Sequence, residues 1–269
     1  MGHQRLGILP ATKAWREIVS YIARGDASVE ALADYVFDAC DKSFSSASND
    51  PAFREAIHLL CKIPLAAKSE NLQESLRELS VDVPANPSRT DILSGFEQAI
   101  ENVQRGNSKN ITDLSEMAKY AGIAALNKLL STPSPAPQLE LWGEPKSGTH
   151  VILRHAATPD GFSDLAQSFF STLGKNNIEY FVSRELPKHL GKGGFSQSIP
   201  DMILFEQNNA RHNNEASLII RNFARDWYAK ANYQDKKKLS QKEVAGFASV
   251  SIEKFRKEYR MRNRPNGTA

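Results

Sequence analysis

The sequence predicts an all-α protein. Apolar residues recur at three- and four-residue spacing through most of the chain, which is the period of an amphipathic helix. Period-two alternation, the pattern of a half-buried strand, is confined to short runs such as 151–153, which suit either a short strand or a helical turn. Four prolines interrupt the helical pattern between residues 132 and 148. We therefore expect two helical subdomains, 1–131 and 149–269, joined by a Pro-rich linker over 132–148.

Capping residues mark where helices of the first subdomain begin. Asp50 followed by Pro51 is typical of an N-cap and first helical position, and Pro64 is expected to end or kink that helix. Ser88 and Asp91 have the spacing of a capping box. The other helices of this subdomain are predicted from apolar stripes at residues 15–22, 29–40, 72–79 and 117–129, the last opened by Asp113 and Glu116.

The second subdomain shows three further stripes. One runs over 162–173 and can extend across the polar residues 174–177 toward Leu186. In the next, Phe223 and Trp227 follow Ala216 and Ile219, and because they lie four apart we expect both to face the core. Ser240 and Glu243 form a capping box for the final helix, whose apolar face is predicted to be Val244, Ala248, Ile252, Phe255 and Tyr259.

Composition bounds the class of protein. The 41% hydrophobic and 24% charged content is that of a globular chain with a core. Its two cysteines, Cys40 and Cys61, lie among apolar neighbours, so we expect reduced, buried thiols in a cytoplasmic protein. No stretch approaches the roughly 18 apolar residues of a membrane span. We therefore expect no contact with a membrane.

Charge is distributed unevenly along the chain. Residues 181–269 hold 17 of the 34 lysines and arginines but only 9 of the 31 aspartates and glutamates. Their formal charge is therefore +8, whereas residues 1–180 carry −5. A basic end on an acidic body indicates an anionic partner or a contact with an acidic surface.

The strongest candidate site lies within that basic third. Cationic residues alternate there with Phe223, Trp227, Tyr228 and Tyr233, a mixture that neutralises phosphates and stacks bases in nucleic-acid complexes. In the other interpretation, Phe223 and Trp227 belong to the core and the lysine run is a solvated loop. The candidate nucleic-acid or partner contacts are Arg221, Arg225, Lys230, Lys236, Lys237 and Lys238, with Arg256, Lys257 and Arg260 on the final helix, away from its apolar face.

The sequence contains no motif of an enzyme or a metal site, and we expect no cofactor. Gly191–Gly194 is glycine-rich and basic but lacks the Lys-Ser/Thr pair of a phosphate-binding loop. Metal-dependent nucleases place lysine two residues after the second acid, whereas Asn208 stands two after Glu206. The alternative is an enzyme whose site assembles from scattered residues such as His155, Asp160, Asp201 and Glu206, with His150 and Asp164 nearby in the sequence.

Three segments carry a resemblance to a group of bacterial proteins. Their sequences are TDLSEMA at 112–118, SRELPKHLG at 183–191 and DWYAK at 226–230. In order and spacing they resemble segments of uncharacterised all-helical accessory proteins found in bacterial anti-phage defence gene clusters. The resemblance implies a non-enzymatic subunit that works beside a helicase, ATPase or nuclease encoded nearby. None of the three segments is a motif of known chemistry, so the resemblance assigns no functional residue.

We therefore expect a helical adaptor or accessory subunit of a bacterial multiprotein system, such as one for phage defence. Its basic C-terminal third would contact a protein partner or DNA, and the sequence leaves these two alternatives open. One alternative is a stand-alone nucleic-acid-binding protein, whose binding would depend steeply on salt. The other is the enzyme with a scattered site, which a metal bound to the purified protein would favour.

Overall fold

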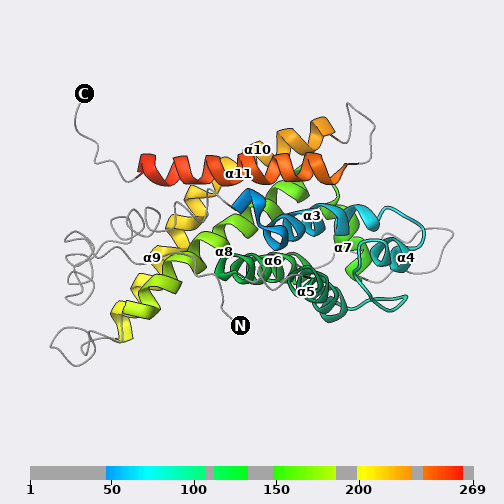
Figure 1. Ribbon diagram of the computed structural model, residues 1–269, viewed down its shortest axis with the longest axis horizontal. Coiled ribbons are helices and arrows are strands. Elements are labelled where there is room, and N and C mark those ends of the chain that lie inside the picture. The colour runs from blue at the N-terminus through cyan, green and yellow to red at the C-terminus, as the bar shows by residue number, and fades with distance from the viewer. Residues whose placement is uncertain (1–46, 107–111, 133–147, 186–198, 232–238, 263–269) are drawn as a thin grey trace.

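The fold is that of a computed structural model, which describes residues 47–106, 112–132, 148–185, 199–231 and 239–262. Within these ranges the regular elements are all helices and no strand occurs, which confirms the all-α prediction (Figure 1). They are η1 Ala47–Asn49, α3 Pro51–Ala66, α4 Leu72–Arg77, α5 Arg89–Arg105, α6 Asp113–Leu130, α7 Gly148–Ala156, α8 Pro159–Glu185, α9 Ile199–Ala216, α10 Leu218–Ala229 and α11 Gln241–Arg262.

Two open questions from the sequence are answered by α7 and α8. Residues 151–153 belong to α7, so the strand alternative is wrong and the helical one is confirmed. Helix α8 continues through the polar residues 174–177 to Glu185 without a break. The stripes at 15–22 and 29–40, the glycines at 191–194 and most of the proline-rich segment lie outside the described residues.

Side-chain caps mark the beginnings of α3, α5, α6 and α11, among other helices. Asp50 caps α3 by accepting a hydrogen bond from the Phe53 N–H at 2.9 Å. Ser88 and Asp91 form the expected capping box of α5, and Ser240 and Glu243 form that of α11. The beginning of α6 differs from the prediction, because Thr112 is its N-cap and exchanges hydrogen bonds with Ser115 rather than Glu116. Each such cap satisfies backbone N–H groups that a helix end leaves unpaired.

Helix α8 lies at the centre of the molecule. Helices α10 and α11 run along one side of it and α5 and α6 along the other (Figure 1). Its phenylalanines join these layers: Phe169 lies 6.1 Å from Phe53 of α3, and Phe170 lies 5.7 Å from Phe255 of α11, between ring centroids. Residues on both sides of the proline-rich segment therefore share one buried core. The division into two subdomains at 132–148 stays a prediction.

Candidate interaction surface

Helices α10 and α11 pack antiparallel through a cluster of aromatic rings. The ring of Phe247 stacks on Phe223 at a 10° angle and 5.4 Å, and it lies 4.5 Å from the ring of Trp227. Farther along α11, the Lys254 ammonium lies 5.2 Å from the Phe223 ring centroid, within the range of a cation–π contact. Phe247 is buried, while Phe223 and Trp227 are only partly covered.

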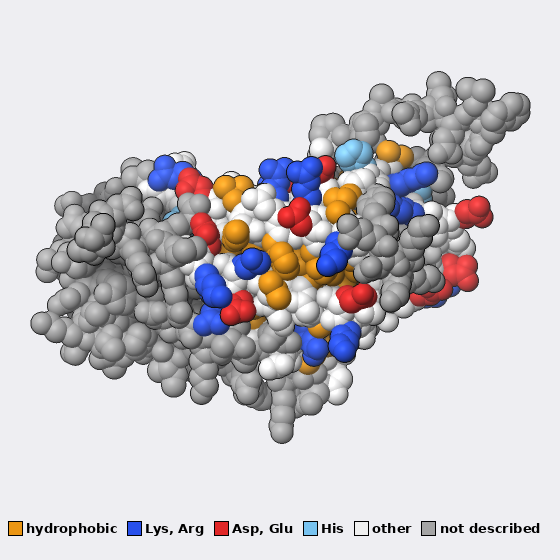
Figure 2. Space-filling model, turned by 90° about the horizontal axis from the view of Figure 1, so that it is seen from above, with side chains coloured by type: hydrophobic (Ala, Val, Ile, Leu, Met, Phe, Trp, Pro, Cys, Tyr) orange, Lys and Arg blue, Asp and Glu red, His pale blue; other side chains and the backbone are white. Residues whose placement is uncertain are grey.

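The outer surface of this helix pair carries an apolar strip. Figure 2 shows hydrophobic side chains gathered in the middle of the face that α10 and α11 form, with charges of both signs around them. Val250 is 41% exposed and Leu218 is 42% exposed, values well above those of a core residue. We define the apolar strip as Leu218, Ile219, Phe223 and Trp227 of α10 together with Val250 of α11.

Three of the predicted basic contacts are already paired within the chain. Arg221 forms an ion pair with Asp164 at 2.7 Å, and Arg225 pairs with Asp160 at 3.0 Å. On α11, Lys257 pairs with Glu253 at 3.6 Å. These guanidinium and ammonium groups are exposed, but neighbouring carboxylates neutralise them. A phosphate would have to compete with those carboxylates for each of them.

The other predicted contacts differ in exposure, and several lie outside the described residues. Lys230 is exposed and has no ion pair in the part of the chain that the structure describes. Arg256 is partly exposed. Lys236, Lys237 and Lys238 lie outside the described residues, as does the side chain of Arg260, although α11 includes its backbone.

The buried face of α10 is displaced by one residue from the predicted one. Ile220, Ala224 and Tyr228 are fully buried, whereas Phe223 and Trp227 lie at the edge of the core. The Tyr228 ring stacks on Phe162 of α8, with 4.8 Å between centroids. Tyr228 therefore cannot stack on a base, and Phe223 and Trp227 are engaged with Phe247. Tyr233 lies outside the described residues.

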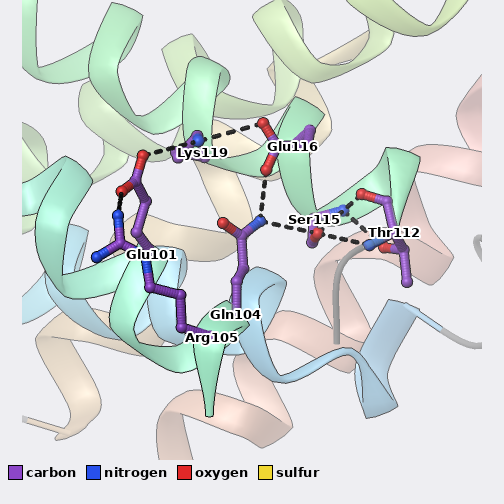
Figure 3. A network of polar contacts seen from close by, with 7 residues as sticks. All are labelled: Glu101, Gln104, Arg105, Thr112, Ser115, Glu116 and Lys119. Carbon is purple, nitrogen blue, oxygen red and sulfur yellow. Dashed lines mark hydrogen bonds and ion pairs between the residues drawn. The ribbon is translucent and has the colours of Figure 1, made fainter. Parts of the chain in front are cut away.

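A polar network between α5 and α6, which the sequence did not predict, forms a second site of charge (Figure 3). The Lys119 ammonium contacts Glu116 at 3.1 Å and Glu101 at 3.5 Å, and Gln104 donates to both Ser115 and Glu116. Burial lowers the pKa of Lys119, but the hydrogen bond and charge of Glu116, together with Glu101, outweigh burial and leave that pKa raised.

This network stabilises the packing of α5 on α6 rather than offering a reactive group. Lys119 is only 5% exposed, so a substrate could not reach its ammonium. The Arg105 guanidinium adds an ion pair to Glu101 at 2.6 Å on the exposed side. The Glu116–Lys119 spacing of three residues was the one available sequence signal, since such pairs meet on one helix face.

The residues considered for an enzyme do not converge in the described part. His155 is exposed on α7, Glu206 is exposed on α9, and Asp160 is paired with Arg225. The side chain of Asp201 lies outside the described residues. Among the described residues no group of three or more His, Cys, Asp or Glu side chains could hold a metal ion.

The remaining observations concern the Cys61 thiol and the apolar character of the helices. Cys61 is a free, buried thiol, and burial raises its pKa to about 12, so it is not a nucleophile at neutral pH. Within the described ranges, no helix combines the length and apolar character that crossing a bilayer requires.

Comparison of the chain with protein-family models, with curated proteins and with solved structures finds no match. The resemblance to accessory proteins of anti-phage defence clusters therefore stays a prediction. The surface itself supplies the basis for a functional proposal.

Proposed function

We propose that this protein is a non-enzymatic accessory subunit that binds a protein partner through the outer surface of α10 and α11. The observation that carries the proposal is the apolar strip, whose members include Leu218 and Val250 at more than 40% exposure. An apolar centre surrounded by charges of both signs is the anatomy of a protein–protein interface. Large exposed apolar patches are uncommon on monomeric proteins and mark interaction sites.

The pairing of charges favours a protein over a nucleic acid as the main partner. Arg221 and Arg225 are held by Asp164 and Asp160, and Trp227 is only partly exposed and packs on Phe247. Binding to a phosphate backbone depends on cations that are free to replace counterions. A mixed rim instead favours recognition of a partner by electrostatic complementarity.

The biological setting follows from the sequence resemblance. A bacterial multiprotein system, such as an anti-phage defence system, would supply a helicase, ATPase or nuclease as the partner. In that arrangement the partner carries the chemistry, and this chain contributes an interaction surface and no catalytic group.

The test is co-purification with the products of neighbouring genes. Val250→Glu and Leu218→Glu place charges in the strip at exposed positions, so both variants are expected to fold and to lose the partner. Tyr120→Glu is the matched control, because Tyr120 is a 55% exposed apolar side chain on α6, outside the strip. Retention of the partner by both strip variants would contradict the proposal.

Nucleic-acid binding is the second candidate, favoured by the +8 charge of residues 181–269 and by the exposed Lys230. Replacing Lys236, Lys237 and Lys238 by glutamine tests it without touching the described core. If the candidate is correct, the triple variant binds DNA more weakly and with a shallower salt dependence than the parent. Equal binding at every salt concentration would eliminate it.

A further inference from the structure

We infer that the occupant of the α10–α11 surface is an acidic amphipathic helix of the partner, which approaches closest at Gly246. This inference rests on the proposed function and adds the chemistry of the partner. Three observations on the α10–α11 pair carry it: a glycine within α11, the apolar strip beside it, and lysines that have no carboxylate partner among the described residues.

Gly246 occupies an exposed position one turn before Val250 on α11. A Cβ atom built at Gly246 would meet no atom within 4 Å, so the packing of the chain gives no reason for a glycine here. Other glycines of the described part behave differently: at Gly95 and Gly122 a Cβ would lie 2.8 Å and 2.3 Å from neighbouring side chains. Glycine weakens a helix interior relative to alanine, and close approach of another backbone is one reason to keep it.

The apolar strip indicates what lies against that glycine. Val250 follows Gly246 by four residues on the same face of α11, and Trp227 and Phe223 of α10 contact Phe247 beside it. A helix seated over this pair of helices would place its own apolar stripe on these side chains. Such helix-in-groove recognition uses anchors at helical spacing.

Both helices of the pair carry lysines that have no carboxylate partner in the part of the chain that the structure describes. Lys230, Lys242 and Lys254 have no ion pair among the described residues, although Lys254 lies over the Phe223 ring. Of the acids nearby, Glu253 is neutralised by Lys257. Glu243 accepts hydrogen bonds from Ser240 and, like Asp226 on α10, stays exposed and negatively charged. Carboxylates that flank the partner's apolar stripe would complement these lysines.

Two synthetic peptides provide the probe for the full-length protein. Both carry leucines at helical spacing, and the polar positions are glutamates in one peptide and lysines in the other. By isothermal titration calorimetry, we expect the acidic peptide to bind at least about tenfold more tightly than the basic one. Lys242→Glu combined with Lys254→Glu should remove that preference, whereas Lys128→Glu, an exposed lysine on α6, should not.

Gly246→Leu tests the close approach. Because a Cβ at Gly246 meets nothing, the variant is expected to fold, to melt no lower than the parent and to bind the acidic peptide at least about tenfold more weakly. Gly106→Leu is the matched control, since a Cβ there has only ordinary contacts at 3.5 Å and the position lies at the end of α5. Equal affinity of Gly246→Leu and the parent would overturn the inference.

Other outcomes are also decisive. The inference falls if the acidic peptide does not bind, if the basic peptide binds equally well, or if sedimentation shows a dimer that Gly246→Leu dissociates, because a second copy would then be the occupant. If Val250→Glu still abolishes co-purification in any of these cases, the proposed function stands without this inference. If co-purification survives both Val250→Glu and Leu218→Glu, the proposed function itself fails.

Discussion

Arg221 of α10 donates a hydrogen bond from Nε to Oδ1 of Asp164 of α8 across 2.7 Å. One turn farther along α10, Arg225 makes the equivalent ion pair with Asp160 at 3.0 Å. The arginine number rises from the first pair to the second while the aspartate number falls, because α8 and α10 are antiparallel. We call these two ion pairs the ladder. Both arginines were predicted to contact phosphates, but in the structure they connect α10 to α8 through these ion pairs.

Removing the two acids should release both arginines without unfolding the protein. We expect Asp160→Asn combined with Asp164→Asn to change the free energy of unfolding by less than about 1 kcal/mol per pair, because exposed ion pairs contribute little. The same variant should bind DNA more tightly and with a steeper salt dependence than the parent, measured by fluorescence anisotropy. Glu253→Gln on α11 is the control that frees a single lysine. Unchanged DNA binding would show that the arginines are structural only.

Asp50 offers a test of stability against pH. Burial raises the pKa of its carboxyl above the ordinary 3.8, although hydrogen bonds from Phe53 and Thr112 act in the other direction. A raised pKa means that the folded state holds the proton more readily than the unfolded state. The stability from this group is therefore present in full below pH 3.8 and is lost as pH rises through the folded pKa.

Asp50→Asn keeps the cap and removes the ionisation. We expect the free energy of unfolding of this variant, relative to the parent, to rise as pH increases from about 4 to about 6. Asp50→Ala also loses the cap and should be about 1 kcal/mol less stable than Asp50→Asn. Urea denaturation over that pH range measures both differences. A difference between Asp50→Asn and the parent that falls with increasing pH would mean that burial does not dominate at Asp50.

Local signals in the sequence predicted much of the described fold. Asp50–Pro51, Ser88–Asp91 and Ser240–Glu243 cap helices where expected, because a cap depends only on residues within one turn. The apolar face of α11 was likewise correct for Val244, Ala248, Ile252 and Phe255.

Two features of the candidate surface, the pairing of its arginines and the buried face of α10, depend on contacts between helices that are far apart in the sequence. Nothing near Arg221 in the sequence indicates Asp164, which lies 57 residues earlier, so the neutralisation of the arginines was not predictable. The expected apolar stripe of α10 ran through Ile219, Phe223 and Trp227, whereas the fully buried residues are Ile220, Ala224 and Tyr228. In the structure Tyr228 stacks on Phe162 inside the core, whereas Phe223 and Trp227 pack on Phe247 at its edge.

The Lys119 network allows a test of how a buried charge is held. Lys119→Met removes the cation that pairs with both Glu101 and Glu116, so the two carboxylates lose their neutralising charge. Both glutamate side chains keep 29% exposure and can be hydrated, so we expect a loss of about 2 kcal/mol, less than for a fully buried pair. Thermal and urea unfolding measure this loss in the free energy of unfolding. Lys128→Met, on the exposed side of α6, should change stability by no more than about 0.5 kcal/mol, and an equal loss in both variants would contradict the network's role.

Tyr228 and Trp227 are neighbours in the sequence but should respond differently to truncation. Tyr228 is fully buried and stacked on Phe162, so Tyr228→Ala leaves a cavity and should cost about 3–5 kcal/mol. Trp227 lies at the edge of the core and contributes to the apolar strip, so Trp227→Ala should cost less stability and reduce partner binding. Differential scanning calorimetry and co-purification, applied to both variants, separate the two roles. If Trp227→Ala is the more destabilising of the two and binds its partner normally, then Trp227 belongs to the core and not to the strip.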